Sequence, residues 1–78
     1  MKPTVNFAGH SFYAIKPLNN HPDDANRHVV VRANPLKDGE FVVHDFNSKS
    51  GEFSNGFYTD DFHTAMQKFF VRGWVVPV

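Results

Sequence analysis

Five histidines have the most versatile chemistry in this sequence, because imidazole can bind metals, transfer protons or change charge near neutral pH. They are His10, His21, His28, His44 and His63. A zinc site needs three or four ligands at about 2.0–2.3 Å, and the sequence contains no cysteine. Asp60 and His63 could share one face of a helix, which supplies only two ligands. We therefore expect structural or surface histidines, and a histidine-based metal site is the third hypothesis for function.

No pattern typical of a catalytic centre is present. The four serines fall in expected loops or turns, and none lies in a G-x-S-x-G sequence. His44 and Asp45 are adjacent on an expected strand, so their side chains point to opposite faces. The sequence GEFSNG at 51–56 lacks the lysine and serine of a phosphate-binding loop. We predict a protein that is not an enzyme and needs no cofactor.

Size and composition predict a single domain, residues 1–78. The absence of cysteine favours a cytoplasmic location. The N-terminus lacks the apolar region of a signal peptide, and no apolar run approaches the roughly 18 residues of a membrane span. Eight basic and eight acidic residues give a net charge of zero, which argues against a strongly basic nucleic-acid binder. We expect a cytoplasmic protein with no membrane partner.

The elements that position these residues can be read from periodicity. Residues 28–34 and 40–46 are rich in β-branched side chains and form a predicted hairpin around the turn PLKDG. An earlier strand is predicted at 10–17, followed by a polar loop over 18–27. The sequence WVVPV at 74–78 predicts a last strand. Its proline, Pro77, places this strand at an edge of the sheet or makes its final residues irregular.

A helix over 60–72 is the strongest prediction, because apolar residues recur with helical spacing. They are Phe62, Ala65, Met66, Phe69 and Phe70. Thr59 or Asp60 would cap its start, and Gly73 would follow its end. The fold class is therefore α+β: a small two-layer domain with a three- to four-stranded antiparallel sheet packed on one helix, in the order β-β-β-α-β.

Alternation divides the predicted hairpin into two faces. The face expected beneath the helix carries Val29, Val31, Ala33, Phe41 and Val43. The other face, expected to be bare, carries His28, Val30, Arg32, Asn34, Glu40, Val42, His44 and Phe46. The expected register places Arg32 opposite Val42, Val30 opposite His44, and His28 opposite Phe46.

The stretch SGEFSNGFYTDDF, residues 50–62, is rich in aromatic side chains. Asn55–Gly56 predicts a tight turn, and Tyr58 is placed to pack on the first helical turn. Phe53 and Phe57 are either packed beneath this bend or exposed.

Arginine and aromatic residues are enriched at binding interfaces, so the bare face and the bend together form a predicted partner-binding surface. An ordinary solvated face is the competing interpretation. The predicted contact residues are Arg32, His44, Phe46, Phe53, Phe57 and Tyr58. We expect a non-catalytic protein-binding module, a small inhibitor or adaptor. Its size class includes phage and mobile-element inhibitors of host defence complexes, such as anti-CRISPR proteins. The bare face and an exposed sheet edge would also suit a homodimer.

Single-stranded nucleic-acid binding is the alternative, because exposed aromatic and arginine side chains on a sheet can stack bases. The expected platform is Phe46, His28, His44 and Arg32, with Lys16, Lys37 and Lys49 near its rim. The balanced charge and the lack of an RNP-like sequence count against it.

Overall fold

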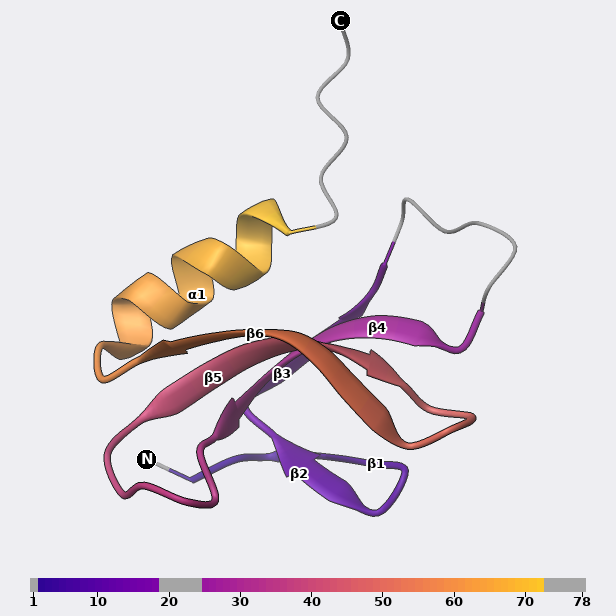
Figure 1. The fold of residues 1–78 in the computed structure, drawn as a ribbon, viewed down its shortest axis with the longest axis horizontal. Helices are drawn as coiled ribbons and strands as arrows, with labels where there is room; N and C mark the ends of the chain where they lie inside the picture. The colour runs from indigo at the N-terminus through magenta and orange to yellow at the C-terminus, as the bar shows by residue number, and fades with distance from the viewer. Residues whose placement is uncertain (1, 19–24, 73–78) are drawn as a thin grey trace, which may run out of the picture.

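The computed structural model describes residues 2–18 and 25–72 and has one helix and two antiparallel sheets within them (Figure 1). The elements are β1 (Val5–Phe7), β2 (His10–Phe12), β3 (Ala14–Pro17), β4 (Arg27–Ala33), β5 (Phe41–Asn47), β6 (Glu52–Thr59) and α1 (Phe62–Val71). One sheet has the order β3-β4-β5-β6, and β1-β2 form a separate hairpin. The α+β class, with a four-stranded antiparallel sheet packed on one helix, is confirmed. The predicted strand 74–78 lies outside the described residues, and the fourth strand is β6.

β4 and β5 pair in the predicted register. Arg32 lies opposite Val42, Val30 opposite His44, and His28 opposite Phe46. The turn between the strands is closed by the backbone N–H of Asn34, which donates to the carbonyl of Glu40 at 2.8 Å. Gly39 has a φ of +79°, a conformation that glycine adopts without steric penalty. Alternation and turn chemistry therefore agree on one register, as expected from the sequence.

The start of α1 differs from the prediction in its capping residue. Asp61 is the N-cap, and its carboxylate accepts the backbone N–H of His63 at 3.1 Å and the hydroxyl of Thr64 at 2.7 Å. The prediction of Thr59 or Asp60 as the cap is wrong. The Thr59 hydroxyl instead accepts the backbone N–H of Asp61 at 3.1 Å, one step before the helix. A side-chain oxygen at the N-cap satisfies amide groups that have no partner within the helix.

The face of the sheet beneath α1 holds the larger core. Its buried members are Leu18, Val29, Val31, Val43, Ala65 and Phe69. Tyr13, Phe41 and Phe62 pack at its margin with ring centroids 5.2–5.5 Å apart. Phe70, which was expected on the same helical stripe, is 59% exposed. The stripe is therefore narrower than the sequence pattern indicated, and Phe69 alone of this pair faces the sheet.

The opposite face of the sheet is not bare, so that expectation is wrong. Figure 1 shows the β1-β2 hairpin on the side of the sheet that is opposite to α1. Its Phe12 is completely buried against Val30 and Phe46, which are 0% and 1% exposed. The hairpin turns at Ala8 and Gly9, both with positive φ, which matches the twist of the strands it joins.

The single strand predicted over 10–17 is broken at Tyr13, between β2 and β3. Phe12 enters the core beneath the hairpin, whereas the Tyr13 ring packs with Phe41 on the helix side. The Tyr13 backbone N–H donates to the carbonyl of Val31 at 2.8 Å and anchors the break. At this bend the chain passes from the β1-β2 hairpin, which covers the sheet, into β3 of the sheet itself.

The Asn55–Gly56 pair lies inside β6, so the prediction of a tight turn there is wrong. Val43 pairs with Phe57 and Asp45 with Ser54, which leaves Asn55 and Gly56 together opposite one residue of β5. This two-against-one arrangement is a β-bulge. Asn55 has a φ of +55°, a left-handed conformation that asparagine tolerates better than most residues. The same sequence signal therefore forms an irregularity within a strand.

Candidate interaction surface around Arg32

The bulge decides which of the predicted contact residues meet. Phe53 and Phe57 would share one face of a regular strand, because side chains alternate with a period of two. The extra residue in the bulge reverses this alternation. Phe57 therefore pairs with Val43 on the helix side, and Tyr58 pairs with Val42 on the hairpin side. Tyr58 joins Phe53 on the hairpin side because of the bulge.

Five of the six predicted contact residues lie together on the hairpin side of the sheet. They are Arg32, His44, Phe46, Phe53 and Tyr58. Phe57 is separated from them by the sheet. Its ring packs against the helix-side core, with the Lys68 ammonium 4.9 Å from the ring centroid.

Arg32 is held by two contacts. Its guanidinium carbon lies 4.0 Å from the centroid of the Phe53 ring, a cation–π contact. Its Nε donates a hydrogen bond to Nε2 of His44 at 3.3 Å. The side chain is partly buried, which lowers its pKa, while the nearby Tyr58 phenol acts in the opposite direction. Arginine stays charged under such conditions.

His44 is a buried neutral imidazole. Burial lowers its pKa from 6.5 to about 4, and the charges of Arg32 and Arg72 act in the same direction. Nε2 accepts the hydrogen bond from Arg32, so the ring proton resides on Nδ1. His44 therefore supports Arg32 as an acceptor throughout the physiological pH range.

Tyr58 is the exposed aromatic residue of this surface, with 55% of its area accessible. Its ring meets His44 edge-on, with centroids 6.2 Å apart. A Cβ atom at Gly56 would lie 3.0 Å from Cε2 of Tyr58, so glycine leaves the space that this ring occupies. The expectation that Tyr58 packs on the first turn of α1 is wrong, because the bulge turns the ring to the hairpin side.

Phe53 and Phe46 form the floor of this surface. Their rings stack with centroids 4.7 Å apart and an interplanar angle of 27°. Phe53 is half-buried and Phe46 is buried. His10 and Phe12 of β2 pack around the same two rings. Phe46 is therefore a core residue beneath the surface, in contrast to its expected position on a bare face.

We define the Arg32 surface as Arg32, His44, Phe53 and Tyr58. Asn55 and Gly56, which position Tyr58 within it, were predicted as a tight turn and not as part of this surface. A glycine inside a strand pattern can form a bulge, but the same Asn-Gly pair also favours a tight turn.

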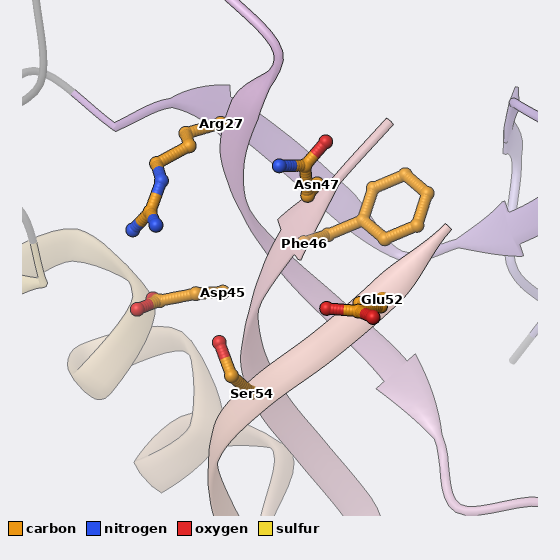
Figure 2. Close-up of a pocket in the computed structure, with 6 residues that line it drawn as sticks. All are labelled: Arg27, Asp45, Phe46, Asn47, Glu52 and Ser54. Carbon is orange, nitrogen blue, oxygen red and sulfur yellow. The ribbon is translucent and has the colours of Figure 1, made fainter. Parts of the chain in front are cut away.

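A second polar feature lies on the helix side of the sheet (Figure 2). A cavity of about 70 Å³ is lined by Arg27, Asp45, Phe46, Asn47, Glu52 and Ser54. Figure 2 shows the Phe46 ring pointing away from Arg27, Asp45 and Ser54. This cavity is smaller than the roughly 300–1,000 Å³ of typical ligand pockets.

The side chains beside this cavity fix the bulge. Asn55 Nδ2 donates to Oδ2 of Asp45 at 2.8 Å, and Arg72 Nη1 donates to the Asn55 carbonyl at 2.6 Å. Arg72 Nη1 also lies 3.6 Å from Oδ1 of Asp45. The end of α1 is therefore tied to the bulge, whose other side carries Tyr58.

Among residues 2–18 and 25–72, no three histidine or acidic side chains are placed to hold a metal ion. His44 faces the hairpin side, His63 lies exposed on α1, and His21 lies outside the described residues. No helix in the described part of the chain is both long and apolar enough to cross a membrane.

Comparison with known proteins identifies no relative. No family model matches the chain, and no curated protein or solved structure matches it. Function must therefore be argued from the residues themselves.

Proposed function

We propose that the protein is a non-catalytic protein-binding module that contacts its partner through the Arg32 surface. One observation carries the proposal. The exposed Tyr58 ring lies beside a partly exposed arginine that is already stacked on Phe53. Tyrosine and arginine are enriched among the residues that dominate binding energy at protein interfaces.

The rigidity of this surface also supports the proposal. Phe53 stacks on Phe46, which is buried in the core beneath the hairpin, and His44 fixes the Nε of Arg32. Side chains that are already ordered lose little conformational entropy when a partner binds. A preformed surface of arginine and aromatic side chains suits a protein partner.

The finer assignment extends the same proposal. We propose a small inhibitor or adaptor in the cytoplasm, of the phage or mobile-element type that includes anti-CRISPR proteins. Its support is the small size and the lack of a catalytic pattern in the sequence. A homodimer is a separate prediction, which now depends on the exposed edge of β6, because the hairpin covers part of the sheet face.

The test is capture of a partner by the tagged full-length chain from a lysate of the source organism, with and without nuclease. Tyr58→Ala should lose a stoichiometric protein partner that the wild type retains after nuclease. Phe70→Ala is the matched control, because Phe70 is an equally exposed aromatic residue on the helix. Capture that Tyr58→Ala leaves unchanged, or that nuclease removes, would overturn the proposal.

Single-stranded nucleic-acid binding is the second candidate, because Tyr58 and the Arg32–Phe53 pair could stack bases. Two residues of the expected platform, Phe46 and His44, are buried, which weakens this candidate. Steep salt dependence of binding would favour it, since phosphate contacts release counterions.

A further inference from the structure

We infer that the guanidinium of Arg32 binds a carboxylate of the partner, an aspartate or glutamate side chain in a protein segment. This inference rests on the proposed function and specifies the partner's chemistry.

The hydrogen-bonding state of Arg32 is the first step. Its Nε is used by His44, and one face of its guanidinium is covered by Phe53. The two terminal amino groups have no hydrogen-bond or ion-pair partner in the described part of the chain, and neither is a buried unsatisfied atom. Arg32 therefore presents free donors to solvent from a fixed position.

The second step is the charge of the contacts that hold Arg32. Phe53 is uncharged, and His44 accepts through a neutral ring. A partner that covers the Arg32 surface would bury an arginine without a counterion unless it supplied one. Burying an unpaired charge is strongly unfavourable, so a partner needs an anionic group at this point.

The third step is the geometry of the guanidinium. Its planar donors match the two oxygens of a carboxylate and can bind them bidentately. Because Phe53 and His44 already fix the plane, little further ordering is needed on binding. Tyr58 lies exposed on the same surface, so an apolar residue beside the acidic one would complete the contact.

The fourth step separates one carboxylate from a nucleic-acid backbone. The other cations with described contacts are held elsewhere: Lys16 donates to the Phe70 carbonyl, Lys37 pairs with Glu40, Lys68 covers Phe57, and Arg72 holds the bulge. Nucleic-acid binding relies on several phosphate contacts along a basic track. The Arg32 surface offers one fixed cation, which fits a single carboxylate of a protein.

The experiment is selection of a phage-displayed library of random 12-residue peptides on the full-length protein. Selected peptides should share an acidic residue next to an apolar one. Changing that Asp to Asn, or Glu to Gln, should weaken binding roughly tenfold or more. This peptide change needs no protein variant, so the test stands even where an Arg32 variant fails to fold.

Protein variants then locate the contact. Arg32→Gln should weaken the acidic peptide roughly tenfold or more but leave the amide peptide almost unaffected, because the two changes remove one interaction. Arg32→Lys should not restore binding, since an ammonium lacks the planar fork. Lys37→Gln is the matched control, because it removes the same charge from an exposed side chain and should leave affinity unchanged.

The outcomes distinguish this inference from the proposed function. Peptides that depend on Tyr58 but show no acidic preference would overturn the carboxylate and leave the protein-binding module standing. An empty selection would overturn both. Binding of a single-stranded oligo-dT that Arg32→Gln abolishes would also overturn both, in favour of nucleic acid.

Discussion

The two faces of the central sheet are both covered, but by different kinds of element. α1 covers the helix side and packs on an aliphatic core around Val31 and Val43. The β1-β2 hairpin covers the opposite side and packs on an aromatic core around Phe12 and Phe46. A helix that covers a sheet can be predicted from its periodically spaced apolar residues. A three-residue strand is too short to show such a periodicity. Burial of the second face is therefore much harder to infer from sequence.

α1 and the β1-β2 hairpin also leave different residues of the sheet accessible to solvent. On the hairpin side, Phe46 is buried, whereas Arg32 and Tyr58 keep contact with solvent. On the helix side, the polar cavity at Asp45 remains next to the end of α1. The candidate surface is accessible because the hairpin covers only part of its face of the sheet.

The largest expected effect tests whether the hairpin is an essential cover. Phe12→Ala should lower the free energy of unfolding by about 3–5 kcal/mol, because it empties a fully buried site. This is a large part of the roughly 5–15 kcal/mol that holds a typical domain together. Urea unfolding at pH 7 measures the change.

The matched control is Phe70→Ala, the same substitution at an exposed position of α1. It should change the free energy of unfolding by less than about 1 kcal/mol. Equal effects of the two substitutions would show that the hairpin is not part of the cooperative core, and the comparison between the faces would fail.

The next effect is pH dependence caused by His44. Its pKa is about 4 in the folded chain and 6.5 ordinarily, so between these values the unfolded chain binds a proton that the folded chain does not. The contribution of the neutral His44 ring to the free energy of unfolding is therefore complete above pH 6.5. It is lost as the pH falls toward 4. The loss is at most about 3 kcal/mol.

Urea unfolding of the wild type and of His44→Gln over pH 7 to 4 measures this contribution. Glutamine keeps an acceptor for Arg32 but does not titrate. The variant should lose less stability than the wild type over this range. Parallel pH profiles would show that burial does not perturb His44, which would contradict its role as a neutral support.

The smallest effect concerns the cap of α1. Asp61→Ala should lower the melting temperature by several degrees, because two hydrogen bonds at the helix start are lost. Asp60→Ala removes an equal charge one residue earlier, where no cap bond forms, and should change it less. Thermal unfolding followed by circular dichroism compares them, and a larger effect at Asp60 would refute the assignment.

The parts of the fold that the sequence predicted are those where local signals agree. Alternation in β4 and β5 and the turn ending at Gly39 specify the same register. The spacing of Ala65 and Phe69 specifies the face of α1. Two details of α1 were predicted wrongly: Phe70 is exposed, and the N-cap is Asp61, because several neighbouring Thr and Asp residues are all competent caps.

The bulge in β6 could not be assigned from the same reasoning. An Asn-Gly pair favours positive φ, and both a tight turn and a bulge use that property. The choice depends on pairing with Asp45 and Val43 of β5, and Arg72 adds a further contact from the end of α1. These contacts join segments that are distant in sequence. The local conformational propensities of Asn55 and Gly56 therefore cannot predict them.

Most residues of the candidate surface were predicted, but the elements that place and cover them were not. Arg32, His44, Phe53 and Tyr58 do lie together. Phe57 is on the other side of the sheet because of the bulge, and Phe46 is buried because the hairpin covers it. Burial is decided by what packs on a face, which strand alternation alone does not specify.

The bulge has a further consequence for how this protein meets copies of itself. β6 is an edge strand, and an edge offers free backbone groups that can recruit another chain into an aggregate. The two residues opposite His44 shift the hydrogen-bonding register in the middle of that edge. An incoming straight strand can pair with residues before the bulge or after it, but not with both. The irregularity that presents Tyr58 therefore also limits the length of strand that can be added at the β6 edge.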